Sequence, residues 1–196
     1  MKLDEYPNLK DRIGQLDEGA ASWQSSSTLR NVTAAAIVIV VVLFLREQLI
    51  PAIAVTAVLL LILIPYFLEF RRAEESWDRI SASDRSQLEQ DAANGEAFGN
   101  ALLLNQYVLV QEQAGLFLIR MKHLSSVSIR IAKPSETHGI SGQNGGDTFL
   151  VSFRDRDGHE YRVLYPSRFG VSEADVLAML KSRIEPENPD ITYQRG

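Results

Sequence analysis

The sequence predicts an α+β membrane protein, in which a two-helix transmembrane hairpin precedes a small antiparallel β domain with a C-terminal amphipathic helix. Three observations lead to this fold class. Residues 32–68 hold two long apolar runs with a short polar break between them. Residues 98–165 alternate between apolar segments and turn residues. Residues 172–184 carry a helix start signal followed by an apolar stripe.

The apolar block, residues 32–70 with its flanks, predicts one span over about 29–46 and a second over about 49–70. The first run is short, roughly 21 Å at the rise of an α-helix against a hydrocarbon core of about 30 Å. Arg30 and Arg46 at its ends can reach the interfaces, which makes this length sufficient. Three polar residues separate the spans, so we expect antiparallel neighbours. Pro65 predicts a kink in the second helix.

A buried helical hairpin in a soluble core and a cleaved signal peptide are the alternatives to a membrane hairpin. The length of the uncharged second run argues against the first, and the largely polar residues 1–31 argue against the second. Basic residues flank the exit of the second span, whereas the connecting turn has Arg46 alone. We therefore expect a multi-pass protein of the cell membrane with both termini cytoplasmic. The basic residues at the exit are Arg71, Arg72, Arg79 and Arg85.

Residues 1–31 are expected to form a cytoplasmic N-terminal tail. Leu9, Ile13 and Leu16 would share one face of a short helix, either transient in a mobile arm or lying at the membrane interface. Residues 71–97 are expected to form a helical linker that ends near Asn94-Gly95.

Residues 98–186 are expected to form the β domain. Turn residues separate the apolar segments at Gln113–Gly115 and at Arg156-Asp157-Gly158, where Asp-Gly supplies the positive φ angles of a tight hairpin. Residues 133–146, rich in glycine, are expected to be a long loop. The expected strands are 101–112, 116–121, 125–131, 148–154 and 159–165.

The last predicted element is a helix over residues 172–184. Ser172 and Asp175 fit a capping box. Pro186 and Pro189 follow the helix and stop it, so residues 187–196 are expected to be a tail. The apolar stripe that should pack on the sheet is Val176, Leu177, Leu180 and Ile184.

Consecutive hairpins followed by a C-terminal helix resemble a pleckstrin-homology-like (PH-like) barrel. The segments that suggest it are Phe98–Val110, Gly115–Ile119 and His123–Ile129. In particular the chain resembles uncharacterised membrane-anchored bacterial proteins with a PH-like domain. The resemblance covers residues 98–189 at most. It implies about five to seven strands, and it brings no catalytic residues to transfer.

No catalytic, cofactor-binding or metal-binding constellation stands out in the sequence, and we predict no enzyme activity. The chain has no cysteine, which excludes disulfides and thiolate sites. A formal net charge of −5 argues against nucleic acid as a partner. His123, His138 and His159 lack the spacing of metal ligands and are expected to be polar surface residues.

Two further motifs could be considered for ligand binding. The acidic residues around one hairpin could hold Ca²⁺, but Arg154, Arg156 and Arg162 lie among them, which favours a solvated hairpin. The glycine-rich run 139–146 lacks the Lys-Ser/Thr ending and the following helix of a phosphate-binding loop. We interpret it as a flexible connection that could contact a partner. The acidic residues are Asp147, Asp155, Asp157 and Glu160.

Three functional hypotheses remain. The first is a membrane-anchored, non-enzymatic interaction or regulatory module with a protein partner. The second is a lipid-binding or envelope-sensing module, for which Arg120, Lys122 and Arg130 are the candidate lipid or partner contacts. The third, more distant, is an enzyme with a site on loop 133–147. The membrane runs contain no ionisable side chain, which argues against a transporter, and their small residues could serve the hairpin or a homo-oligomer.

Overall fold

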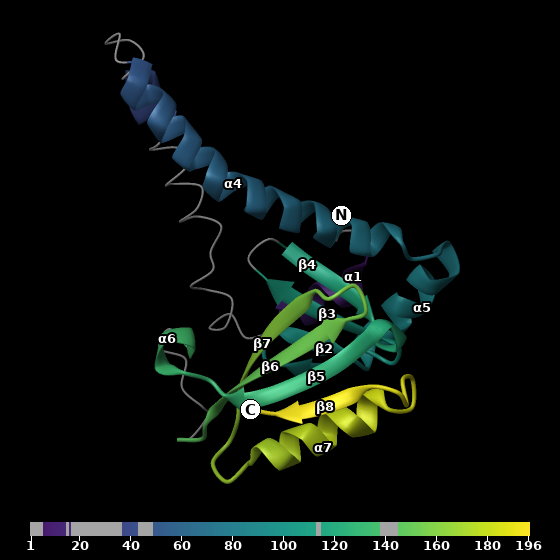
Figure 1. Cartoon of the computed structure of the whole chain (residues 1–196). Coiled ribbons are helices and arrows are strands. Elements are labelled where there is room, and N and C mark those ends of the chain that lie inside the picture. Colours follow the sequence, from purple (N-terminus) through teal and green to yellow (C-terminus); the bar gives the residue numbers. More distant parts are fainter. Residues whose placement is uncertain (1–5, 15, 17–36, 43–48, 113–114, 138–144) are drawn as a thin grey trace.

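The structure, a computed structural model, describes residues 6–14, 16, 37–42, 49–112, 115–137 and 145–196. It confirms the α+β class: two four-stranded sheets pack together, and a long helix protrudes from them (Figure 1). The helices are α1 (Pro7–Gly14), α4 (Leu49–Asp78), α5 (Ala82–Ala93), α6 (Pro134–Thr137) and α7 (Glu173–Ile184), with a short 3-10 helix η2 (Met121–His123). The strands are β1 (Glu96–Phe98), β2 (Ala101–Leu103), β3 (Tyr107–Glu112), β4 (Gly115–Arg120), β5 (Leu124–Ile131), β6 (Thr148–Asp155), β7 (Glu160–Pro166) and β8 (Thr192–Arg195).

The long helix α4 runs without a break through the predicted second span and on to Asp78. It contains Pro65, and Figure 1 shows that it changes direction along its length. The apolar part far from the sheets is exposed, as Ile50 at 82% and Leu61 at 74% illustrate. Ile53–Asp78 is long and apolar enough to cross a membrane, and it is the one such helix among the described residues.

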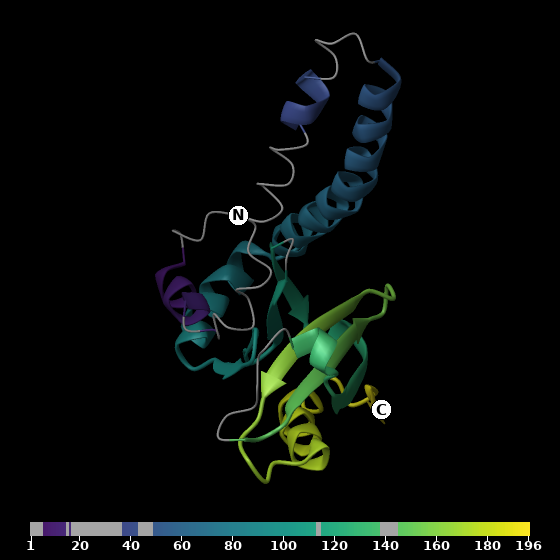
Figure 2. The ribbon, with the colours of Figure 1, turned by 90° about the vertical axis from the view of Figure 1, so that its left-hand side faces the viewer.

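The predicted first span is described only in part. Residues 37–42 are helical, and they lie beside the far end of α4 in both views (Figures 1 and 2). The remainder of the span predicted over 29–46 lies outside the described residues. The structure therefore contains one candidate membrane helix, and the two-span hairpin stays a prediction.

The two sheets meet at the loop between β1 and β2. Sheet 1 has the order β1-β2-β3-β4 and is antiparallel; sheet 2 has the order β7-β6-β5-β8, with β8 parallel to β5. The buried Asn100 side chain donates to the Gln111 carbonyl in β3 at 2.7 Å and to the Arg162 carbonyl in β7 at 3.2 Å. It also accepts from the Leu164 amide at 2.9 Å. One side chain thus joins both sheets.

Sheet 1 is buried on both faces, which gives the domain two cores. The inner core lies between the sheets and against α7, where Val176, Leu177, Leu180 and Ile184 are buried as predicted. The outer core lies on the other face of sheet 1, beneath α1, α5 and the end of α4. Its members are Leu9, Leu16, Trp77, Ile80, Leu88, Ala92, Leu102, Leu104, Tyr107, Leu109 and Leu118.

The strand predicted over 101–112 is wrong as one element, because the chain turns within it. The Leu104 amide donates to the Tyr107 carbonyl at 2.9 Å, and this tight turn separates β2 from β3. The turn went unseen because Leu104 is apolar and buried in the outer core, so the run has no polar break at that point. With β1 and β8 also present, the described residues form eight strands rather than the five expected from the sequence.

The C-terminal tail predicted over 187–196 instead forms β8, which pairs with β5. Asn188, in the segment between α7 and β8, is buried and donates to the carbonyls of Met121 at 2.9 Å and Leu124 at 2.8 Å. These contacts redirect the chain after α7. They join residues more than 60 positions apart, which is why the proline-rich local sequence did not reveal them.

The N-terminal tail also differs from expectation over its described part. Leu9 and Ile13 of the predicted stripe lie on a helix, α1, Leu16 follows it, and α1 packs on α5. Leu9 is 0% exposed and Leu16 is 3% exposed, and the Tyr6 ring lies 6.2 Å from that of Trp77. Residues 17–31 lie outside the described residues.

The other predicted helix signals are confirmed. The Ser172 hydroxyl and the Asp175 carboxylate form a reciprocal capping box at the start of α7. In the linker, α5 begins at its N-cap Ser81 and ends at the C-cap Asn94, one residue before Gly95.

Candidate functional site

The junction between α4 and sheet 1 is where the long apolar helix meets the domain. The Trp77 indole Nε1 donates to the Leu116 carbonyl at 2.8 Å, and the Ser76 hydroxyl accepts from the Leu118 amide at 3.1 Å. These bonds satisfy backbone groups on the free edge of β4, which would otherwise be open to another strand. Close packing supports them, since a Cβ on Gly115 would lie 3.3 Å from that of Ala73. The end of α4 is thus held against the domain.

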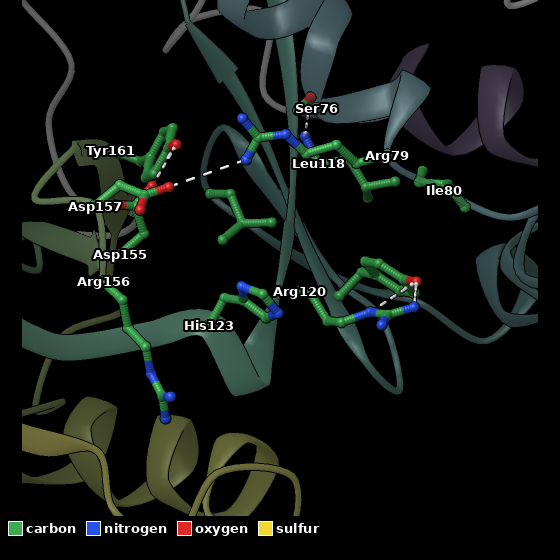
Figure 3. Close-up of a pocket in the computed structure, with 12 residues that line it drawn as sticks. Ser76, Arg79, Ile80, Leu118, Arg120, His123, Asp155, Arg156, Asp157 and Tyr161 are labelled. Carbon is green, nitrogen blue, oxygen red and sulfur yellow. Dashed lines mark hydrogen bonds and ion pairs between the residues drawn. The ribbon is translucent and has the colours of Figure 1, made fainter.

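A pocket of about 240 Å³ lies beside this junction (Figure 3). Its walls come from the end of α4, from β4 and η2, and from the hairpin between β6 and β7. The polar groups at its rim carry charges of both signs. These are Arg79, Arg120, His123, Asp155, Arg156 and Asp157.

Two of the acidic residues around the pocket have partners there. Arg79 reaches across the pocket to Asp157 at 3.9 Å, and both side chains are exposed. Asp155 accepts from the Tyr161 hydroxyl at 3.0 Å and from the His159 amide at 2.8 Å. Burial, with the negative charge of Asp155, raises the pKa of Tyr161, which keeps its proton and stays a donor.

The hairpin between β6 and β7 has one group of side chains that could be considered as a cation site. Donor atoms of Asp155, Asp157 and His159 lie within 4.8 Å of one another. The Asp155 oxygens already accept three contacts, including the His159 ring at 3.3 Å, so the geometry is that of a hydrogen-bonded turn. Arg154 and Arg162 pair with Glu160 at 3.6 Å and 3.1 Å, in the interleaved pattern of compensating charges that the sequence indicated.

The structure does not gather Arg120, Lys122 and Arg130 into one basic pocket. Arg120 closes β4, and Lys122 lies two residues later in η2. Arg130 lies six residues along β5 from Leu124, a distance of about 20 Å in a strand. Arg130 therefore lies at the opposite end of β5 from Arg120 and Lys122.

Two of these three basic side chains are also bound to acidic neighbours. Arg120 lies 2.6 Å from the Asp84 carboxylate and donates to the Tyr107 hydroxyl at 2.8 Å. Arg130 makes two bonds to Glu136, at 2.5 Å and 2.8 Å. The pairing lowers the pKa of Glu136 to about 2. The positions of these basic residues in the sequence could not show such partners.

The long loop is described at its two ends only. It begins with α6, and it closes where Gly146 packs so tightly on the backbone of Ser167 and Arg168 that a Cβ would clash. His138 and most of the glycine-rich run lie outside the described residues. Within the described residues, the pocket beside α4 includes no residue of this loop.

A docking site for α1, missed from the sequence, lies on the outer core. The Glu89 carboxylate of α5 accepts from the Asn8 amide at 2.6 Å and from the Leu9 amide at 3.3 Å. The Arg12 guanidinium donates to the Gly95 carbonyl. The stripe of Leu9 and Leu16 was visible in the sequence, but its receptor comes from residues about 80 positions away.

Comparisons of this chain with protein-family models, with curated proteins and with solved structures found no match in any of the three searches.

Proposed function

We propose that the chain is a membrane-anchored, non-enzymatic interaction module that presents a PH-like domain at the cytoplasmic face. One observation carries the proposal: a single helix, α4, is an exposed apolar rod over one half and a docked part of the domain over the other. Exposed apolar surface on this scale calls for lipid. Because the helix is continuous, the bilayer then holds the domain close and limits its orientations.

The position of α1 supports a two-span hairpin. α1 precedes the apolar block and α5 follows it, yet the two helices are in direct contact. Two segments in contact must lie on the same side of the bilayer, so the chain between them crosses an even number of times. α4 supplies one crossing, and the first apolar run, of which residues 37–42 are helical beside α4, supplies the other.

The orientation follows from the basic residues. Arg71 and Arg72 are exposed on α4 where it approaches the domain, whereas Arg46 is alone in the connecting turn. The excess of basic residues on the domain side favours a cytoplasmic location for it.

The strand order supports a PH-like domain. Four antiparallel strands form sheet 1, three consecutive antiparallel strands form the body of sheet 2, and the amphipathic helix α7 packs in the inner core. A fourth strand in sheet 2, the parallel β8, is an addition to that pattern.

Single-cysteine labelling tests the anchoring and the topology, because the native chain has no cysteine that would react. Gln48→Cys probes the connecting turn, and Asp11→Cys and Glu187→Cys probe exposed positions in α1 and after α7. In intact cells, an impermeant maleimide should label the turn alone; after permeabilisation it should label all three. Labelling of only one of the α1 and C-terminal positions in intact cells would refute the hairpin. Release of the chain by alkaline carbonate would refute the anchoring.

The lipid-binding alternative receives less support from the geometry. Its candidate residues do not lie together in one pocket, and Arg120 and Arg130 already have carboxylate partners. A flotation assay with full-length protein in nanodiscs tests it: preferential binding of vesicles rich in anionic lipid, lost in Arg120→Gln and Arg130→Gln but not in Arg168→Gln, would favour this alternative.

A further inference from the structure

The site of α1 has the form of a groove that receives a short helix. We call it the α1 groove. It is formed by α5, by the end of α4 and by the outer face of sheet 1, and Leu9 and Leu16 insert into it. Its apolar floor includes Trp77, Ile80, Leu88 and Leu104.

The polar contacts in the groove recognise a helix by its first turn. The first amides of a helix have no partner within the helix and carry partial positive charge. Here the receptor supplies the cap, because Glu89 belongs to α5 and reaches the amides of Asn8 and Leu9. Further along, the Gly95 carbonyl accepts from Arg12. The groove thus selects both a direction and a basic position.

Of the three acidic residues of α5, Glu89 is the one that contacts α1 in the interactions described above. Asp84 pairs with Arg120, and Asp91 accepts from the Asn105 side chain. A charged contact of this kind fixes register and discriminates between ligands more than it adds affinity.

α1 is a weak ligand that depends on its tether. It has eight residues, and Leu9 is its one buried residue. Isolated helices shorter than about 12–15 residues are marginal in water. Attachment to the same chain offsets this weakness, because it makes the binding of α1 intramolecular. Such a segment can be displaced.

We propose that the α1 groove is a binding site for a short amphipathic helix of a partner protein, and that α1 occupies it in cis as an internal competitor. The partner helix would have no N-cap side chain of its own. It would carry apolar residues at the spacing of Leu9, Ile13 and Leu16 and a basic residue at the place of Arg12. This inference rests on the proposed function, because it names the partner class of the interaction module.

The test uses full-length protein in nanodiscs and a fluorescent, N-acetylated peptide with the sequence of residues 6–16 as the probe. Anisotropy should report weak binding to the wild type, where α1 competes. Leu9→Asp in the protein removes the competitor, and binding should tighten at least tenfold. Adding Glu89→Ala to that variant should weaken binding about fivefold, the usual cost of losing a helix cap.

Matched controls separate the groove from nonspecific binding. Asp11→Asn changes the exposed face of α1 and should bind the peptide as weakly as the wild type. A peptide with Leu9→Asp should bind none of the proteins. Equal binding of the probe to the wild type and the Leu9→Asp protein, or equal binding of the two peptides, would overturn the proposal.

A measurement on an intact groove covers the case in which Leu9→Asp prevents folding. A nitroxide on Asp11→Cys reports the mobility of α1 by electron paramagnetic resonance. Saturating probe peptide should mobilise the label, whereas an unchanged spectrum would overturn the proposal. Carbonate extraction of cell membranes that contain the same protein tells the two failures apart: protein that stays in the membrane but does not exchange α1 refutes the groove alone.

Discussion

Sheet 1 and sheet 2 belong to one domain, yet their outer faces differ in burial. In sheet 2, β5 alternates between buried Val127 and Ile129 and the partly exposed Ser126, Ser128 and Arg130. In sheet 1, both faces of β3 are buried from Tyr107 to Val110. The second buried face is the one that receives α4, α5 and α1. The outer core is therefore where the long helix α4 joins the domain.

The largest expected loss of stability comes from shortening a side chain in the outer core. Leu109→Ala should lower the free energy of unfolding by about 2–4 kcal/mol, because it leaves a cavity beneath α5 and α1. Ser128→Ala, on the outer face of sheet 2, should change it by less than about 0.5 kcal/mol. Urea denaturation of the full chain in micelles, followed by tryptophan fluorescence, measures both. Similar losses in the two variants would show that the two outer faces are equivalent.

A somewhat smaller effect is expected where the two sheets are joined. Asn100→Ala removes three hydrogen bonds and leaves buried backbone groups unpaired, which should cost about 2–3 kcal/mol. Asn105→Ala, which removes an exposed bond to Asp91, is the control and should be close to neutral. Hydrogen exchange should show faster exchange of the Leu164 amide in Asn100→Ala. Unchanged exchange there would mean that the sheets are held together without Asn100.

The bond between α4 and sheet 1 should contribute less. Trp77→Phe keeps an aromatic ring in the outer core but loses the donor to the Leu116 carbonyl, at a cost of about 1 kcal/mol. Glu75→Gln breaks an exposed pair with Arg71, which is 3.9 Å long, and should have almost no effect. Thermal unfolding by circular dichroism compares them. A stability loss in Glu75→Gln as large as in Trp77→Phe would contradict a specific role for the indole.

The smallest effect concerns sheet 2 and depends on pH. Arg130 lowers the pKa of Glu136 from 4.5 to about 2, so the pair stabilises the folded state above pH 4.5. That contribution declines as pH falls from 4.5 and is lost below about 2. The Tm difference between wild type and Glu136→Gln should therefore shrink across this window. Glu187→Gln is the exposed control and should show no such trend, and a constant difference for Glu136→Gln would refute the assignment.

Local signals in the sequence predicted the elements whose cause is local. The capping box of Ser172 and Asp175, the alternation in β5 and the Asp157-Gly158 turn each depend on neighbours a few residues apart. The split between β2 and β3 escaped prediction, because burial of Leu104 on the second face of sheet 1 removed the polar break that marks most turns.

At the candidate site, local sequence predicted even less, because it does not show the partners of the basic residues. Arg120 and Arg130 were predicted as lipid or partner contacts, but they pair with Asp84 and Glu136, which come from helices outside their strands. A charge count along the chain cannot show which charges are paired, because pairing depends on distances set by the fold.

The sequence by itself determined where the long apolar helix α4 lies, where α7 begins and that a β-rich domain follows the apolar block. These outcomes depend on hydrophobic length and periodicity, which are properties of consecutive residues. Only the tertiary structure decided that residues 192–195 form a strand and that α1 docks on α5. It also decided that sheet 1 has two buried faces. Each of these depends on contacts between residues far apart in the chain, such as 39 positions for Trp77 and Leu116 and 81 positions for Asn8 and Glu89, and no local pattern specifies such partners.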